Sequence, residues 1–258
     1  MLKIPMNPFH WSINRVKSSL RYVIREELNR CLRDVTREEF DAGMNRWLRD
    51  IDFGLRLRAI MDSASFVYEN IPLHKRFDPF ELRQRALELA PKGGLLMEFG
   101  VWKGTWINRI ASWTDRQIYG FDSFEGIPEP WSFRQKGFFA LDAPPEVKGN
   151  VTLVKGRFDE SLPVFLREHP EHVAFIHMDC DLYASTRTVL ELIKDRLVVG
   201  TTLVLDDFLM EPGWQRQEHK AWLDFAEINN VKFEYFGYQT AIACAVGVQI
   251  TEIPLKNE

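Results

Sequence analysis

Two stretches of the chain decide its fold: VAFIHMD at residues 173–179 and TTLVLDD at residues 201–207. Both are short apolar runs rich in β-branched and aromatic residues, which is typical of buried strands in a parallel sheet. The first ends on Asp179 and the second on Asp206 and Asp207. Burying an unpaired carboxylate is costly, so these acids are not there for the core. Because ligands bind beyond the carboxyl ends of strands in an open α/β sheet, three carboxylates at neighbouring strand ends predict a divalent cation and a chemical reaction.

From residue 95 onward, strand-like runs alternate with helical patterns. Strands are predicted at 95–101, 117–123, 151–158, 173–179, 201–207, 232–238 and 241–250, and helices at 105–113, 161–169, 185–197 and 215–229. Strands separated by helices of about 10–15 residues predict an α/β fold with a doubly wound, mostly parallel sheet. The last two strands have no helix between them, which predicts one antiparallel strand.

The first 90 residues have a different, helical and charge-rich pattern. Helices are predicted at 12–35, 36–51, 54–71 and 78–90, and the PKGG sequence at 91–94 is a helix stop signal. The chain therefore divides into a helical N-terminal region, residues 1–90, and an α/β domain, residues 91–258.

Bulk properties exclude several classes of protein. The 258 residues carry a net charge of −4, which argues against a nucleic-acid binder. Three distant cysteines, Cys31, Cys180 and Cys244, indicate neither a disulfide framework nor a zinc site. No apolar run is long enough to cross a membrane and no secretion signal is visible, so a cytoplasmic protein is expected. Residues 1–30 are rich in Lys and Arg; a solvated helix face or a subunit contact explains this more simply than a membrane surface.

A glycine-containing turn follows the first predicted strand of the α/β domain. In EFGVWKG, residues 98–104, Gly100 and Gly104 bracket the turn into a helix. The spacing is not the GxGxxG of a dinucleotide site, and glycines for a tight turn explain it equally well. Asp122, about twenty residues on at the next strand end, is placed to accept ribose hydroxyls. No phosphate-binding loop of the GxxxxGK[ST] type occurs, so a nucleoside without phosphates fits best, and S-adenosylmethionine is the leading candidate.

The predicted S-adenosylmethionine site draws on three segments of the chain. Its residues are Glu98, Gly100, Val101, Gly104, Thr105, Asp122, Ser123, Arg157 and Phe158. The glycine turn would approach the methionine part, while Ser123, Arg157 and Phe158 would line an adenine slot. The sequence around Phe158 fits an ordinary core position at least as well as a role in adenine binding. The alternative role for Glu98 is that of a paired structural charge.

Four motifs in this order carry a family resemblance: MEFGVWKGTW (97–106), YGFDSFEGIP (119–128), HMDCDLYAST (177–186) and LVLDDF (203–208). Over roughly residues 60–245 the chain resembles the macrocin O-methyltransferase family, which methylates sugar hydroxyls of antibiotics. The resemblance implies a class I Rossmann-like methyltransferase core that uses S-adenosylmethionine and Mg²⁺. It also implies a helical N-terminal part that forms a lid and subunit contacts, hence a homo-oligomer. The first 50 residues and the 129–146 loop match no family motif, which leaves the acceptor open.

Carried over by position, the resemblance makes Asp179, Asp206 and Asp207 the Mg²⁺ ligands and Asp179 the catalytic base. Asp181 competes with Asp179 as a ligand, although it more plausibly caps the turn into the next helix. The alternative for Asp206 and Asp207 is a helix-capping cluster. His177 lies on the same side of its strand as Asp179, where a satisfied core histidine is favoured over a catalytic one.

The expected function is methyl transfer from S-adenosylmethionine to a hydroxyl of a small molecule, a sugar of a glycosylated natural product. Aromatic residues that could cover such an acceptor are Phe66, Tyr68, Trp131, Phe133, Phe138, Phe139 and Trp214. One alternative is methylation of a cell-surface or lipid-linked glycan, with the basic N-terminal helices docking on the membrane. A further alternative is a non-catalytic nucleotide-binding scaffold, and an NAD-dependent oxidoreductase is disfavoured by the missing GxGxxG.

Overall fold

The structure, a computed structural model, describes residues 49–239 and 244–254. The chain separates into two compact units, Met1–Gly54 and Leu55–Glu258, and the second contains the whole sheet. The helix predicted at 12–35, nearly all of the helix predicted at 36–51, the basic stretch 1–30 and Cys31 lie outside the described residues. The proposed lid and subunit contacts of residues 1–90 therefore stay predictions.

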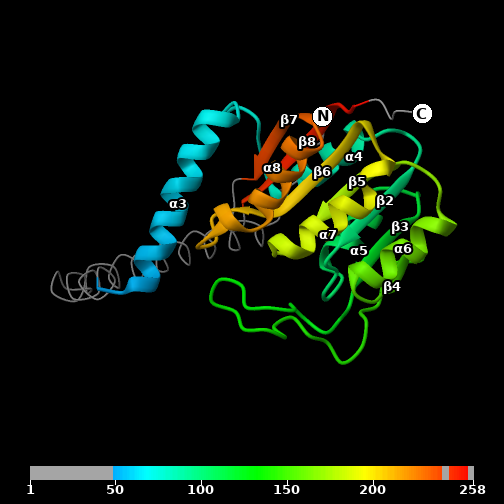
Figure 1. The fold of residues 1–258 in the computed structure, drawn as a ribbon, viewed down its shortest axis with the longest axis horizontal. Coiled ribbons are helices and arrows are strands. Elements are labelled where there is room, and N and C mark those ends of the chain that lie inside the picture. Colours follow the sequence, from blue (N-terminus) through cyan, green and yellow to red (C-terminus); the bar gives the residue numbers. More distant parts are fainter. Residues whose placement is uncertain (1–48, 240–243, 255–258) are drawn as a thin grey trace, which may run out of the picture. The chain divides into compact units, whose positions relative to one another are not determined.

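One eight-stranded sheet organises the second unit (Figure 1). Its strand order is β1 (Arg76–Phe77), β7 (Lys232–Gln239), β8 (Cys244–Glu252), β6 (Leu197–Leu209), β5 (Val173–Met178), β2 (Leu95–Phe99), β3 (Ile118–Asp122) and β4 (Val151–Lys155). Only β8 runs antiparallel to its two neighbours, β6 and β7, and the other pairings are parallel. The mostly parallel, doubly wound sheet with one antiparallel strand is confirmed.

Helices cover both faces of the sheet, as a parallel sheet requires. On one face lie α4 (Pro79–Leu89) and α5 (Thr105–Ala111); the other is covered by α3 (Ile51–Asn70), α6 (Phe158–Glu168), α7 (Tyr183–Ile193) and α8 (Glu218–Ile228). Alternate residues of β2 serve the two cores: Leu96 packs with α4 and α5, whereas Met97 and Phe99 pack on the opposite face. This alternation makes the central strands apolar throughout.

Several element boundaries differ from those predicted. The strand predicted at 151–158 ends at Lys155, because Gly156 has φ +141° and turns the chain into α6, which begins at Phe158. The strand predicted at 201–207 is longer, Leu197–Leu209, and the helix predicted at 215–229 is split into a short 3-10 turn, Trp214–Arg216, and α8. The helix α4 begins as predicted, with Pro79 in its first turn after an Asp78–Glu81 capping box.

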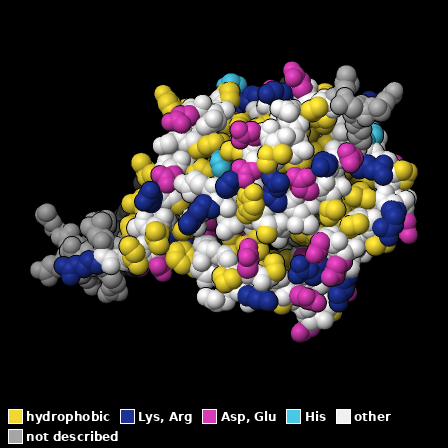
Figure 2. All heavy atoms as spheres, in the orientation of Figure 1, with side chains coloured by type: hydrophobic (Ala, Val, Ile, Leu, Met, Phe, Trp, Pro, Cys, Tyr) yellow, Lys and Arg dark blue, Asp and Glu magenta, His cyan; other side chains and the backbone are white. Residues whose placement is uncertain are grey.

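The segment between β3 and β4 contains no helix or named strand, as expected for the 124–149 loop. On the face shown in Figure 2, basic and acidic side chains are interspersed. Among the described residues, no helix is both long and apolar enough to cross a membrane.

Candidate functional site

The glycine turn after β2 lies directly against the end of β5. A Cβ atom on Gly100, whose φ is +88°, would lie 1.7 Å from the backbone oxygen of Asp179. The two segments are also joined by a hydrogen bond from the Asp179 N–H to the Phe99 carbonyl, 2.8 Å. Gly100 is therefore required by backbone packing, and this contact places the turn beside the acid that ends β5.

Asp122 holds the same turn in place. Its Oδ2 accepts hydrogen bonds from the backbone N–H groups of Val101 and Trp102, each at 2.8 Å, and its Oδ1 accepts from Phe124 at 2.7 Å. A carboxylate that accepts several N–H groups fixes a loop firmly. Contact between Asp122 and a ribose stays a prediction. Such a contact would use the carboxylate lone pairs that these three bonds leave free.

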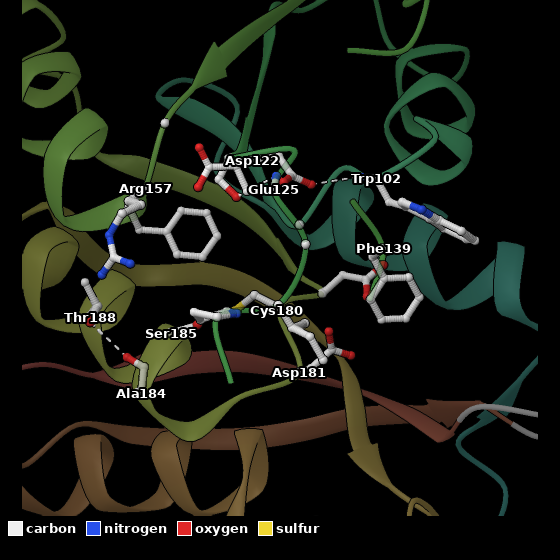
Figure 3. A pocket seen from close by; sticks show the side chains of 18 of the residues that line it. Trp102, Asp122, Glu125, Phe139, Arg157, Cys180, Asp181, Ala184, Ser185 and Thr188 are labelled. Atoms are coloured by element: carbon white, nitrogen blue, oxygen red, sulfur yellow. Dashed lines mark hydrogen bonds between the residues drawn. The ribbon is translucent and has the colours of Figure 1, made fainter. Parts of the chain in front are cut away.

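A cavity of about 340 Å³ opens between the glycine turn, the start of α6 and the start of α7 (Figure 3). That volume suits a small-molecule ligand. Six predicted site residues line it: Gly100, Asp122, Ser123, Arg157, Phe158 and Asp179. The other predicted positions are not part of its lining: Glu98, Val101, Gly104, Thr105, Asp206 and Asp207.

The cavity also has lining residues that sequence reasoning did not select. These are chiefly Trp102, Glu125, Cys180, Ser185 and Thr188, while Asp181, considered as a ligand in place of Asp179, also lines it. Trp102 has φ +45°, an unusual backbone conformation for a bulky residue, and its ring contacts that of Phe139 at 5.1 Å between centroids. The only signal in the sequence was their proximity to the glycine turn and to Asp179.

Glu98 and His177 belong to a buried network on the α4–α5 face. His177 Nδ1 lies 3.0 Å from a carboxylate oxygen of Glu98, and Arg83 Nε donates to His177 Nε2 at 3.1 Å. The second bond makes Nε2 the acceptor, so the proton of a neutral imidazole is on Nδ1 and faces Glu98. Burial and the nearby Arg83 lower the pKa of His177 well below its usual value. His177 is thus a satisfied core histidine, as favoured, with neither ring nitrogen free for a cation.

Arg83 is the residue that closes this network. It also donates to Gln239 at 3.0 Å and to the Pro79 carbonyl at 2.8 Å, and it forms an ion pair with Asp206. Its guanidinium stacks on the Trp106 ring, 3.6 Å from the centroid. Burial lowers the pKa of Arg83 to about 10, which leaves it charged at neutral pH.

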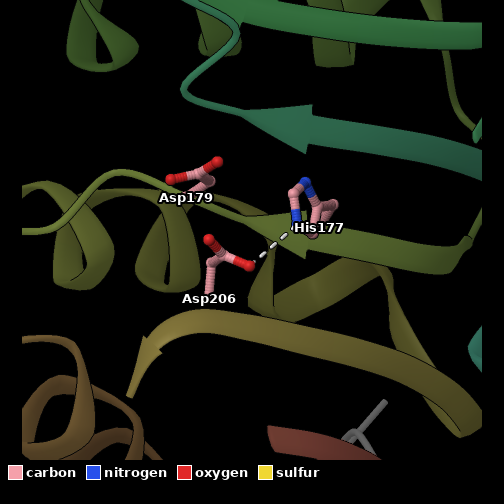
Figure 4. A group of neighbouring side chains, drawn as sticks. All are labelled: His177, Asp179 and Asp206. Carbon is pink, nitrogen blue, oxygen red and sulfur yellow. Dashed lines mark ion pairs between the residues drawn. The ribbon is translucent and has the colours of Figure 1, made fainter. Parts of the chain in front are cut away.

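The two acids at the end of β6 point to opposite faces, as adjacent strand residues do. Asp206 faces Arg83 and lies 3.5 Å from His177 Nε2 (Figure 4). Asp207 instead faces Asp181, and oxygens of the two carboxyls lie within 4.8 Å of each other. Burial raises the pKa of both groups. Neither acid caps a helix, because both lie within β6 and α8 has Gln217 as its N-cap residue.

Asp179 stands between these two groups. Its carboxylate lies within 4.8 Å of Asp206 on one side and of both Asp181 and Asp207 on the other. Burial raises the pKa of Asp179 to about 8; the charge on Asp207 adds to the effect and Arg83 opposes it. Asp179 is therefore the carboxyl that joins the cavity to the acidic cluster.

The expected capping role of Asp181 is wrong. The N-cap residue of α7 is Leu182, without a side-chain cap, and the Tyr183 N–H donates to the side chain of Gln217 instead. Asp181 has φ +62° at the centre of a tight turn closed by a 2.6 Å bond from the Leu182 N–H to the Cys180 carbonyl. Such turns are strained, and this one directs the Asp181 carboxyl to Asp207 and the cavity.

The donor set fits a hard divalent cation. Five carboxyls gather around β2, β5 and β6: Glu98, Asp179, Asp181, Asp206 and Asp207. Arg83 is the one cation that forms an ion pair with any of them in the described part of the chain. Oxygen ligands of this kind are those that Mg²⁺ prefers. Within residues 49–239 and 244–254, Asp179, Asp181 and Asp207 form no ion pair, while one oxygen of Asp206 is held by Arg83.

Comparison with known proteins places the chain among methyltransferases by fold. Its structure resembles that of the calicheamicin methyltransferase CalS11, with a TM-score of 0.55 and 21% identity over 83% of this chain and 93% of that one. It also resembles the O-methyltransferase NovP, with a TM-score of 0.50 and 24% identity over 67% and 79%. The chain has a methyltransferase fold.

Sequence similarity covers the core of this methyltransferase fold. Residues 97–208 match the family described as "Methyltransferase domain". The chain is 27% identical over 162 residues to demethyldecarbamoylnovobiocin O-methyltransferase of Streptomyces niveus, a match spanning 52% of this chain and 61% of that protein. It is 28% identical over 145 residues to a tetracenomycin 4'-O-methyltransferase of Streptomyces olivaceus, whose name gives its substrate a dimethoxyrhamnosyl group; that match spans 46% of this chain and 54% of the relative. The chain thus spans less than two thirds of either relative.

Proposed function

We propose that the protein is an S-adenosylmethionine-dependent O-methyltransferase of the macrocin type that requires Mg²⁺ and acts on a sugar hydroxyl of a glycosylated natural product. One observation carries the proposal: a single cavity is lined both by the glycine turn with Asp122 and by Asp179 and Asp181. A methyl donor at the first group and a hydroxyl at the second would meet inside it. The O-methyltransferase relatives support the reaction, and the rhamnosyl group in the name of one supports the acceptor class.

Asp179 is the proposed catalytic base. It lines the cavity, and burial raises its pKa to about 8, which makes its ionised form a stronger base than an ordinary carboxylate. As the proton moves to Asp179, the hydroxyl oxygen forms its bond to the methyl carbon. The bond between that carbon and the donor sulfur breaks, and S-adenosylhomocysteine leaves.

Asp179 and Asp207 would hold the cation, with either Asp206 or Asp181 as the third carboxylate. When bound, Mg²⁺ would supply Lewis-acid polarisation of the acceptor hydroxyl. The residues of the chain do the rest: Asp122 and Gly100 fix the turn beside the donor, and the network around Arg83 fixes Asp206. Holding both reactants in line contributes a large part of the rate of such reactions.

The acceptor would lie between the 124–149 loop and the acidic cluster. Trp102 and Phe139 line the cavity there with touching rings, and flat aromatic faces suit the apolar side of a sugar ring. Arg134 lies over Trp131 and pairs with Glu211, which ties the loop to the segment after β6. The loop is therefore held over the acidic side of the cavity by specific contacts.

The test measures methyl transfer from labelled S-adenosylmethionine to a panel of glycosides and their aglycones. We expect transfer to a glycoside, loss of at least about 90% of the rate in excess EDTA, and recovery on adding Mg²⁺. Full activity in EDTA would refute the cation requirement, and transfer to the aglycones alone would refute the sugar hydroxyl.

A further inference from the structure

Glu218 is a buried acid to which the proposed reaction gives no role. It is the first residue of α8 and has no solvent exposure. Both of its carboxylate oxygens are buried without a hydrogen-bond partner, and it forms no ion pair within residues 49–239 and 244–254. Native structures rarely leave a buried carboxyl in this condition, and an ion is one of the standard explanations.

The carboxyl of Glu218 is directed at the acidic cluster. Burial and the charges of Asp207 and Asp179 raise the pKa of Glu218 well above its usual value, and the nearby Asp207 backbone opposes this shift. Glu218 in turn raises the pKa of Asp181 and of Cys180, so it is electrostatically close to the turn after β5 as well. It therefore approaches Asp179, Asp181 and Asp207 from the α8 side of the sheet, opposite Arg83.

The start of α8 is held in this position by its neighbour. The Gln217 side chain accepts a 3.0 Å hydrogen bond from the Tyr183 N–H, the first residue of α7. This bond joins the N-terminus of α8 to that of α7, which follows the strained turn at Asp181. The start of α8, which carries Glu218, is thus held beside the segment that carries Asp179 and Asp181.

Neither nearby hydrogen-bond donors nor the helix dipole explains why the Glu218 carboxyl is buried. Trp214 and Trp222 lie four residues before and after it, and their indole N–H groups could have served as donors, yet both are also buried without partners. An acid in the first turn of a helix gains only about 0.3–1 kcal/mol from the helix dipole. That gain is small beside the cost of burying an unpaired carboxylate, which is several kcal/mol.

We propose that Glu218 is a positioning residue of the cation site: its negative charge behind Asp207 strengthens binding of a divalent cation at Asp179, Asp181 and Asp207. It supports these ligands from the side away from the acceptor and touches neither reactant. This inference rests on the proposed function, because it requires that the acidic cluster bind a cation.

The test measures cation binding itself, on the full chain with S-adenosylhomocysteine present. Free Mn²⁺ is followed by its electron paramagnetic resonance signal during titration of wild type, Glu218→Gln and a matched control, Glu227→Gln, which changes an exposed acid of the same helix. Groups that support metal ligands typically change affinity by about 10- to 100-fold. We expect Glu218→Gln to weaken Mn²⁺ binding by at least about tenfold, with the control and the affinity for S-adenosylhomocysteine within about twofold of wild type.

A thermal readout separates this role from a structural one. Without cation, Glu218→Gln should melt at or above the wild-type temperature, because it removes a buried ionisable group that has no hydrogen-bond partner. With Mg²⁺, its gain in melting temperature should be smaller than that of wild type. A residue needed only for folding would lower the melting temperature in both conditions.

Each outcome decides a different claim. Wild type that takes up no Mn²⁺ refutes the cation requirement of the proposed function, and the role of Glu218 with it. Wild type that binds Mn²⁺ while Glu218→Gln binds it equally tightly overturns the role of Glu218 alone. If the Gln variant does not fold, Glu218→Met replaces it, since an apolar side chain of similar length suits the buried site; unchanged Mn²⁺ affinity in that variant overturns the proposal equally.

Discussion

Replacing Arg83, a buried residue of α4, with methionine should strongly destabilise the protein. Arg83 has no solvent exposure and binds Asp206, His177, Gln239 and a backbone carbonyl. Methionine fills much of the same space but leaves the Asp206 charge and the His177 acceptor unpaired. Removing one partner of a buried ion pair costs about 3–5 kcal/mol. For a domain of this size that corresponds to a fall in melting temperature of about 6–20 °C.

The control for this substitution is Arg85→Met on the same helix. Arg85 is exposed and pairs with Glu88, a contact worth about 0–1 kcal/mol. Urea unfolding followed by tryptophan fluorescence, with calorimetry as a second probe, gives both free energies of unfolding. A double variant with Asp206→Asn should lose clearly less than the sum of the single losses, because the two changes remove one interaction. If Arg83→Met lies within about 1 kcal/mol of Arg85→Met, the buried network does not hold Asp206 as described.

Three further predictions follow from the site and its surroundings. Gly100→Ala should abolish stable folding or S-adenosylhomocysteine binding, because its Cβ would meet the Asp179 backbone, whereas Gly149→Ala, with open space around it, should behave as wild type in calorimetry. Asp122→Ala should weaken S-adenosylhomocysteine binding by more than about tenfold, since two backbone N–H groups of the turn and that of Phe124 lose their acceptor; equal affinity would contradict this. Burial lowers the pKa of His219 from 6.5 to about 4. As the pH falls, this histidine is therefore protonated in the unfolded chain before it is protonated in the folded protein. The stability of wild type relative to His219→Leu should therefore drop by about 3 kcal/mol between pH 6.5 and pH 4, and a difference that does not vary with pH would show that His219 is not desolvated.

The parts of the site that sequence could predict are those carried by strand ends. Asp122, Asp179, Asp206 and Asp207 each follow or end an apolar run, and a parallel sheet brings such ends to one edge. The pairing of Met178 with Leu205 places Asp179 beside Asp206, as the motif order suggested.

The partners of these acids could not be predicted. Arg83 comes from a helix far away in sequence, and nothing in its neighbourhood distinguishes it from the exposed Arg85. That Asp206 and Asp207 face opposite sides did follow from strand geometry, but which side holds Arg83 depends on tertiary packing. The role of Asp181 was also hidden, because its direction is set by the tight turn between β5 and α7, which no motif in the sequence marked.

The measurement that tests the central claim most directly is methyl transfer by Asp179→Asn. The account holds that Asp179 joins the donor cavity to the acidic cluster and takes the proton of the acceptor hydroxyl. Its amide replacement has the same size and cannot act as a base. We predict that the variant binds S-adenosylhomocysteine with near wild-type affinity in calorimetry but loses at least about 100-fold in the rate of transfer to a glycoside at saturating Mg²⁺. A rate within about threefold of wild type at equal donor affinity would contradict the account, because general-base catalysis of this kind contributes a factor of about 100 or more.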